Sequence, residues 1–450
     1  MKDQNFLKEN NARHMWHPMG HPGDAQKDAP KIISRAEGVH IFDIDGHSTV
    51  DAVGGLWNVN LGYSNDVVKQ AIADQLFQLP YYSAFAGTSN PTAIELSYVL
   101  KEFFAEDGMV RSFITSGGSD SVETTLRLAR QYHRLRGEPT RTKFLSLKKG
   151  YHGTHFGGAS VNGNNRFRTA YEPLLPGCFH LPAPYAYRNP FDETDPARLA
   201  DLIASAMVDE IDFQGANTIA AFIMEPILGA GGVIIPHESF MSKMREICDR
   251  YGILLIADEV ITGFGRTGDW SGSRHWGVQP DMMSTAKGIT SGYFPVGAVM
   301  IGEKVTDVFE QDQTGEGAIY HGYTYSAHPV GAAAAIANIG EMQRLELTGN
   351  AAVRGAQLYQ GVLALAENYD IIGDVRGGHG LMMGIELVSD RTTKAPMDLA
   401  TMKRIHQATY DAGSMVRLGG NNILMSPPLI ITDVEIDVIL SALDAGFSAA

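Results

Sequence analysis

Short apolar runs alternate with longer helical patterns through the middle of the chain, and this order constrains the fold more than any other feature. Fully apolar runs at residues 219–224 and 253–257 are typical of strands buried on both faces. Between them, the periodicity of residues 238–251 predicts a helix, which Gly252 ends. The repeated order of strand, helix and strand predicts an α/β protein with a mostly parallel sheet between helices. Ligands of such sheets bind beyond the carboxyl ends of the strands.

The length of 450 residues exceeds the usual size of one domain. We expect a large ligand-binding domain over residues 61–330. A smaller α+β domain would form from both chain ends, residues 1–60 and 331–450. The first of these ends contains a hairpin pattern with Asp45 and Gly46 at its turn.

Charge and hydropathy narrow the ligand class to small molecules. The formal net charge of −15 disfavours nucleic acid and anionic membrane surfaces as partners. No segment has the roughly 20 apolar residues needed to span a bilayer, and the amino terminus lacks the apolar core of a secretory signal. The two cysteines have no CxxC spacing, and the histidines have no metal-binding spacing. We expect a cytoplasmic protein without a metal site.

A candidate phosphate-binding segment lies between the strand pattern of residues 109–115 and a helical pattern. It has the sequence SGGSD at residues 116–120. Glycine lets the backbone approach an anion, and the free N–H groups of a helix start point at it. The hydroxyl of Ser119 adds a donor. The alternative is an ordinary helix start capped by Ser119 or Asp120.

Asp258 and Lys287 each follow an apolar strand pattern. Their spacing leaves room for one crossover between parallel strands, which would place both at the same edge of the sheet. A buried carboxylate could pair with a protonated pyridine nitrogen. A lysine among apolar groups has a lowered pKa and can attack an aldehyde. The alternatives are a pair between Asp258 and Arg266, and an exposed surface position for Lys287.

Two further motifs follow strand patterns. Tyr151, in GYHG, offers an aromatic face for a flat ring, although a core position is an equal alternative. We interpret its neighbour His152 as structural. The segment GFGRTG at residues 263–268 matches a dinucleotide-binding pattern, but the two acidic residues before it and the lack of a helical pattern after it disfavour that interpretation.

Taken together, these motifs resemble the class III (subgroup II) pyridoxal-phosphate-dependent aminotransferases of fold type I. The resemblance is carried, in the order of the family, by SGGSDSVETT, GYHG, EPILGAGGV, DEVITGFGRTG, STAKGITSGYFPVGAV and HGYTYSAHP. It runs from about Trp57 to beyond Arg417. One departure is GGSD at residues 117–120, where many members have SGSE. Ser119 is retained, so the phosphate site is expected to persist.

The resemblance implies pyridoxal 5′-phosphate as cofactor and assigns it a set of residues. Lys287 would form the Schiff base and shuttle the proton, and Asp258 would bind the pyridine nitrogen. Contacts to the ring faces and the phosphate would come from Tyr151, Val260, Gly118 and Ser119. Thr324, in HGYTYS, matches a threonine that reaches the cofactor of a neighbouring subunit. The implied assembly is a homodimer or a dimer of dimers with shared active sites.

The resemblance also suggests the substrate class. Members acting on ornithine or 4-aminobutyrate have a glutamate at the position of Ala230, whereas this chain is similar to the amine–pyruvate branch. There, an arginine matching Arg417 binds the keto acid carboxylate, and an aromatic residue matching Trp57 lines the amine pocket. The alternatives for these two are a surface salt bridge and a core tryptophan. We expect ping-pong transfer from an amine or ω-amino acid to pyruvate.

Other functions remain open at this point. Within the family, the acceptor could be 2-oxoglutarate, or the enzyme could be a mutase or a decarboxylating transaminase. Outside it, a nucleotide-binding regulatory module on a doubly wound sheet is the rival.

Overall fold

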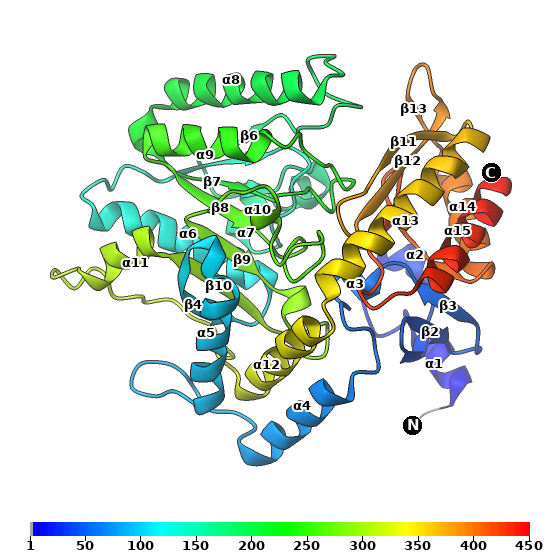
Figure 1. The fold of residues 1–450 in the computed structure, drawn as a ribbon, viewed down its shortest axis with the longest axis horizontal. Coiled ribbons are helices and arrows are strands. Elements are labelled where there is room, and N and C mark those ends of the chain that lie inside the picture. The colour runs from blue at the N-terminus through cyan, green and yellow to red at the C-terminus, as the bar shows by residue number, and fades with distance from the viewer. Residues whose placement is uncertain (1–2) are drawn as a thin grey trace.

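A computed structural model describes residues 3–450 of the chain, and its largest sheet has seven strands (Figure 1). Strand β10 is antiparallel to its neighbours β4 and β9, and the other pairs of this sheet are parallel. The predicted mostly parallel sheet is therefore confirmed. In spatial order, the strands are β4 (Met109–Thr115), β10 (Gly297–Gly302), β9 (Met282–Thr285), β8 (Leu254–Asp258), β7 (Ile219–Met224), β5 (Lys143–Leu147) and β6 (Cys178–Leu181).

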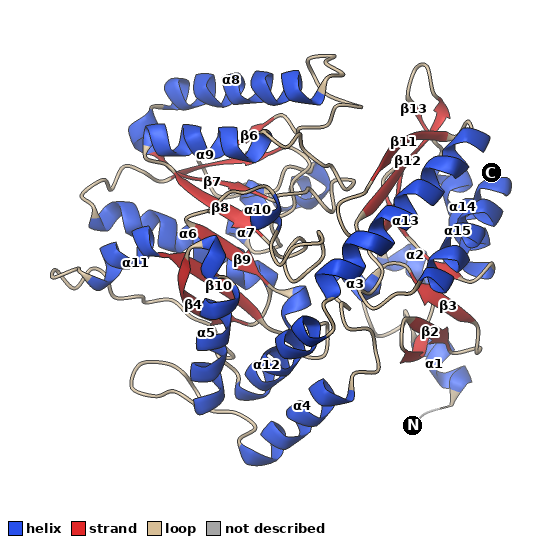
Figure 2. Ribbon diagram, in the orientation of Figure 1, coloured by secondary structure: helices blue, strands red, loops and turns tan. Residues whose placement is uncertain are grey.

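Helices cover both faces of this sheet, which explains why its central strands are apolar throughout (Figure 2). Along β8, Leu254 and Ile256 pack into one buried cluster with helix α6 (Gly118–Leu135). The alternate residues Leu255 and Ala257 pack into the cluster on the other face, together with α9 and α8. The helices of this region are α4 (Asp66–Gln78), α5 (Pro91–Phe103), α7 (Phe156–Val161), α8 (Pro196–Gln214), α9 (Phe240–Tyr251), α10 (Gly272–His275), α11 (Glu303–Glu310) and α12 (Pro329–Arg344).

The two ends of the chain meet in the smaller α+β part, as predicted. The expected hairpin forms between β2 and β3, and β3 then pairs in parallel with β14 from the other end of the chain. The division at residues 60 and 330 stays a prediction. This part contains α1 (Gln4–Asn10), α2 (Pro22–Lys27), α3 (Gly54–Trp57), α13 (Leu347–Asn368), α14 (Leu399–Asp411) and α15 (Asp433–Ser448). Its strands are β1 (Ile33–Glu37), β2 (His40–Asp43), β3 (Ser48–Asp51), β11 (Ile372–Arg376), β12 (Met383–Asp390), β13 (Ala395–Pro396), β14 (Ser414–Met415), β15 (Arg417–Gly419) and β16 (Asn422–Met425).

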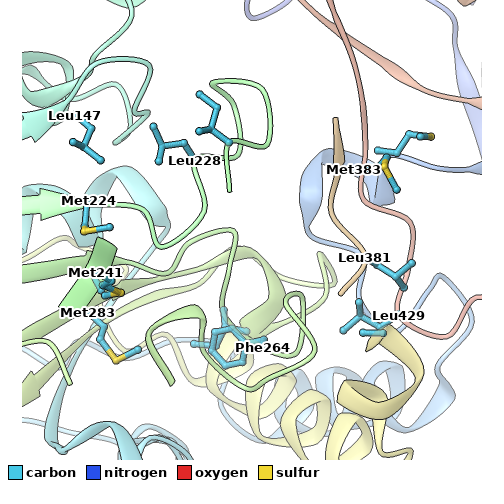
Figure 3. Close-up of a cluster of buried hydrophobic side chains, with 14 of the residues drawn as sticks. Leu147, Met224, Leu228, Met241, Phe264, Met283, Leu381, Met383 and Leu429 are labelled. Atoms are coloured by element: carbon cyan, nitrogen blue, oxygen red, sulfur yellow. The ribbon is translucent and has the colours of Figure 1, made fainter. Parts of the chain in front are cut away.

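One buried apolar cluster joins the large sheet to the smaller part. Figure 3 shows Met224 and Met283 of the sheet on one side, Phe264 in the middle, and Leu381 and Leu429 on the other side. The region between the two parts is therefore packed, and the site below is held from both. In the described residues 3–450, no helix is long and apolar enough to cross a membrane.

Candidate active site

Strand ends bring most of the predicted site residues to one edge of the seven-stranded sheet. Asp258 is the last residue of β8 and lies opposite Ser284 of β9, three residues before Lys287. Tyr151 follows β5, and Gly118 opens the helix after β4. Together they enclose a cavity of about 140 Å³, whose lining includes Gly118, Ser119, Tyr151, Asp258, Val260 and Lys287. The parallel topology thus places groups far apart in the sequence around one small volume.

Asp258 is buried and held by hydrogen bonds rather than by a cation. His152 Nδ1 lies 2.8 Å from Asp258 Oδ2, and the N–H of Val260 donates to Oδ1 at 3.2 Å. The alternative of an ion pair between Asp258 and Arg266 is wrong, because the Arg266 guanidinium donates to two backbone carbonyls and to Asn60. His152, which we interpreted as structural, therefore positions the carboxylate, and only its place after Tyr151 at a strand end could have indicated this.

Lys287 lies half-buried in the cavity wall, so the alternative of a surface lysine is wrong. Burial lowers the pKa of its amine to about 8, against the opposing effect of the carboxylates of Asp258 and Glu225. A larger fraction of this amine is uncharged near neutral pH than of an ordinary lysine. The side chain is therefore suited to attack an aldehyde and to move a proton.

Glu225 is a site residue that the sequence analysis missed. It follows β7, is buried, and accepts hydrogen bonds from the N–H groups of Tyr151 at 2.8 Å and Gly229 at 2.9 Å. Burial raises the pKa of its carboxyl to about 7. The side chain fixes the start of the loop that carries Tyr151, and its position after a strand in EPILG was the available signal.

The start of α6 has the features of an anion site. No side chain of the described chain caps it, so its first N–H groups remain free for a ligand. A Cβ on Gly118 would lie 3.0 Å from a methyl group of Val260, so a larger residue would narrow this space. The Ser119 hydroxyl accepts from the N–H of Thr154 at 3.1 Å and does not cap the helix. A phosphate group and a flat ring held against Val260 fit this arrangement.

A second cavity of about 620 Å³ adjoins the first and shares Tyr151 and Lys287 with it. Its wall also includes Trp57, Ala230 and Arg417, so these three predicted substrate-binding residues lie together with the fourth, Tyr151. Trp57 is both a cavity wall and a core residue, since it packs in a buried cluster of aliphatic side chains. It is only 4% exposed.

Arg417 is half-buried, and its guanidinium has no hydrogen bond or ion pair anywhere in residues 3–450. The alternative of a surface salt bridge is therefore wrong. Burial lowers the pKa of the Arg417 guanidinium, and the positive charge of the nearby Arg166 lowers it further.

Thr324 does not join the other residues within one chain. It is exposed outside both cavities, and its carbonyl accepts from the Tyr81 hydroxyl at 2.6 Å. The segment GFGRTG forms turns followed by the four-residue helix α10, which does not provide the long helix of a dinucleotide site.

Comparisons with known proteins agree with this geometry. The family model for "Aminotransferase class-III" matches residues 23–446. The putrescine–pyruvate aminotransferase of Pseudomonas aeruginosa is 36% identical over 91% of this chain and 89% of its own length. The diaminobutyrate–2-oxoglutarate transaminase of Halomonas elongata is 35% identical over 93% of this chain and 90% of its own length.

Solved structures extend the similarity to the whole backbone. An amine transaminase from an uncultivated Pseudomonas species, solved with bound pyridoxal phosphate, matches with a TM-score of 0.95 and 48% identity, over 97% of this chain and 98% of its own. An (S)-enantioselective ω-transaminase from Thermomicrobium roseum matches with a TM-score of 0.95 and 36% identity, over 100% and 99%.

Proposed function

The chain belongs to the class III aminotransferases, pyridoxal-phosphate-dependent enzymes of fold type I, and from this premise we propose that it transfers an amino group from an amine or ω-amino acid to pyruvate. The observation that supports this proposal most strongly is the position of Arg417 in the second cavity. Its unpaired guanidinium shares a cavity with Lys287, and Ala230 in the same wall supplies no acid to neutralise it. A small keto acid can therefore bind its carboxylate to Arg417 while its carbonyl carbon lies at Lys287.

Lys287 and Asp258 have separate roles around the cofactor. When bound, pyridoxal phosphate supplies an aldehyde that reacts with amines and a ring that accepts negative charge. Lys287 would hold that aldehyde through Nζ, and its amine would move the proton from the amine-bearing carbon of the donor. Asp258, positioned by His152, would hold the proton on the ring nitrogen.

The remaining site residues bind and orient. Tyr151 and Val260, which line the first cavity, would hold the two faces of the ring, and the start of α6 with Gly118 and Ser119 would bind the phosphate. Trp57 lines the pocket for the donor. These contacts hold the reacting carbon beside Lys287, which is the main requirement for a fast proton transfer.

Exposed Thr324 supports a homodimer as the active assembly. In the proposed dimer, Thr324 reaches the phosphate of the partner's cofactor, and each active site contains residues of both subunits. This position explains why the threonine lies outside the cavities of one chain.

The lowered pKa of Lys287 predicts how fast the apoprotein takes up its cofactor at different pH values. The neutral amine is the attacking form, and its fraction rises as pH increases through the pKa of about 8. We expect the rate of covalent uptake of pyridoxal phosphate to rise up to about that pH and then to level off. Stopped-flow absorbance measures the rate. A rate that keeps rising toward 10.5, the value of an ordinary lysine, would contradict a buried amine.

Half-reactions followed by absorbance test the proposed function. In the wild-type holoenzyme, 1-phenylethylamine or β-alanine should bleach the cofactor band, and pyruvate should restore it. In Arg417→Ala, we expect bleaching by 1-phenylethylamine at a similar rate. Restoration by pyruvate should slow about tenfold or more, because the charge-assisted hydrogen bonds to the carboxylate are lost.

The control is Arg404→Ala, which removes an arginine of α14 outside both cavities. Restoration in that variant should match the wild type. Equal slowing of both half-reactions in Arg417→Ala would mean that Arg417 is structural. A wild-type band that no amine bleaches would contradict the proposal as a whole.

A further inference from the structure

The substrate cavity carries more positive charge than one carboxylate requires. Apart from Lys287, which would hold the cofactor, its lining contains four cationic side chains and a single carboxylate: Lys149, Arg166, Arg188, Arg417 and Glu386. The carboxylate is already used, because Glu386 accepts from Arg188 Nε at 2.5 Å and from the Tyr185 hydroxyl. Since the whole chain has a net charge of −15, this local excess of positive charge is a property of the cavity.

Lys149 is the cation whose position is most firmly built. It lies two residues before Tyr151, with a left-handed backbone at φ +68°. Its N–H donates to the carbonyl of Gly163 at 2.8 Å. Gly231 packs directly against it, since a Cβ there would come within 2.4 Å of the Lys149 carbonyl oxygen. A backbone held in this way fixes the direction in which the Lys149 side chain leaves the chain, and the side chain lines the cavity.

The Lys149 ammonium has no acidic partner in the described part of the chain. It is half-buried, and within residues 3–450 its Nζ has no hydrogen bond or ion pair; its aromatic neighbour is the Tyr185 ring, with the centroid 5.5 Å away. A charge removed from water without a partner is unfavourable. An anionic ligand would supply that partner.

The carboxylates near Lys149 are already bound by other groups. Burial lowers the pKa of the Lys149 amine, Glu386 opposes this shift, and the cations Arg376 and Arg188 add to it. Asp374, the other carboxylate of this cluster, is already bonded by Arg376. Arg166 is the weaker candidate for an anion site, because it is exposed and donates to the backbone carbonyl of Met19 at 3.2 Å.

We propose that Lys149 binds a second acidic group of the substrate, distant from the reacting carbon, while Arg417 binds the first. The ligands of this subsite are keto acids with two acidic groups and the amino acids related to them, with a carboxylate or a sulfonate at the far end. Pyruvate leaves the subsite empty. The inference rests on the proposed function, because it requires that Lys287 and Arg417 face the substrate.

Two acceptors of equal chain length test the subsite. 2-Oxoglutarate and 2-oxopentanoate share the keto acid end and differ only in the distal carboxylate. For Lys149→Met, we expect kcat/KM for 2-oxoglutarate to fall about tenfold, the loss of one charge-assisted hydrogen bond. The values for 2-oxopentanoate and pyruvate should stay within about twofold of the wild type. Lys149→Arg should recover most of the loss, because it restores the charge.

Lys148→Met is the matched control, because this exposed neighbour lines neither cavity. Lys148→Met should leave kcat/KM for both acceptors unchanged. Melting temperatures will show whether each variant is folded. An unchanged ratio of the two acceptors in Lys149→Met would overturn the assignment. A loss confined to 2-oxoglutarate in Arg166→Gln but not in Lys149→Met would also overturn it.

Calorimetry separates this inference from the proposed function. Glutarate has both carboxylates but no reacting group, so its binding to the holoenzyme needs no turnover. We expect its Kd to rise about tenfold in Lys149→Met and to stay unchanged in Lys148→Met. Equal glutarate binding by Lys149→Met and the wild type would refute the subsite even if pyruvate is a good acceptor. Weaker glutarate binding by Lys149→Met would support the subsite even if pyruvate is a poor acceptor.

Discussion

Lys287→Ala is expected to abolish transamination, with turnover reduced by about 10⁴-fold or more. Two functions are lost together, because the amine both binds the cofactor covalently and moves the proton, and a positioned proton-transfer group alone contributes about 10²–10⁴-fold. The remaining contacts at Gly118, Ser119 and Asp258 should still hold pyridoxal phosphate noncovalently. Steady-state turnover with an amine and pyruvate measures the loss.

Borohydride reduction followed by mass spectrometry shows where the cofactor is attached. The wild type should carry the added mass on the peptide containing Lys287, and Lys287→Ala should carry none. Lys304→Ala is the control, because this lysine is partly exposed and paired with Asp281. Transamination retained in Lys287→Ala would refute the central assignment.

Asp258→Asn is expected to reduce turnover by about 10³-fold while the cofactor remains bound. A neighbouring carboxylate raises the pKa of the ring nitrogen by about one to three, because it stabilises the protonated form. An amide of the same shape has no charge and does not stabilise that form. The ring then loses its proton at neutral pH and stabilises negative charge poorly. Turnover and a pH titration of the cofactor absorbance measure the two consequences.

A matched carboxylate outside the cavities provides the control. Asp269 Oδ2 lies 2.8 Å from His275 Nδ1, the same contact that Asp258 makes with His152. Asp269→Asn makes the same substitution in a more exposed aspartate–histidine pair and should leave turnover unchanged. Turnover of Asp258→Asn within about tenfold of the wild type would show that the carboxylate has only a structural role.

The sequence predicted the large sheet well because its strands are apolar on both faces. The patterns at β7 and β8 leave no exposed alternative for such residues. The site residues at strand ends, Asp258 and Lys287, were predictable for the same reason, since parallel strands carry their final residues to one edge.

The contacts between distant segments were not predictable in this way. No pattern around Arg266 indicates that it donates to the carbonyls of Leu381 and Pro427, more than a hundred residues later. The buried contact between His152 and Asp258 likewise depends on how two loops approach each other in space. Local sequence defines each loop, but only the packed structure defines the pair.

The pairing of β3 with β14 has a consequence for how the protein is made. Residues near Val50 leave the ribosome long before their strand partner near Ser414. Arg417 follows β14 in the chain, so the site cannot form before this region has been synthesised. Contacts of such long sequence separation form slowly, and the open edge of β3 must stay free of other strands meanwhile. The wall near Arg417 therefore depends on a strand from far along the chain docking beside β3.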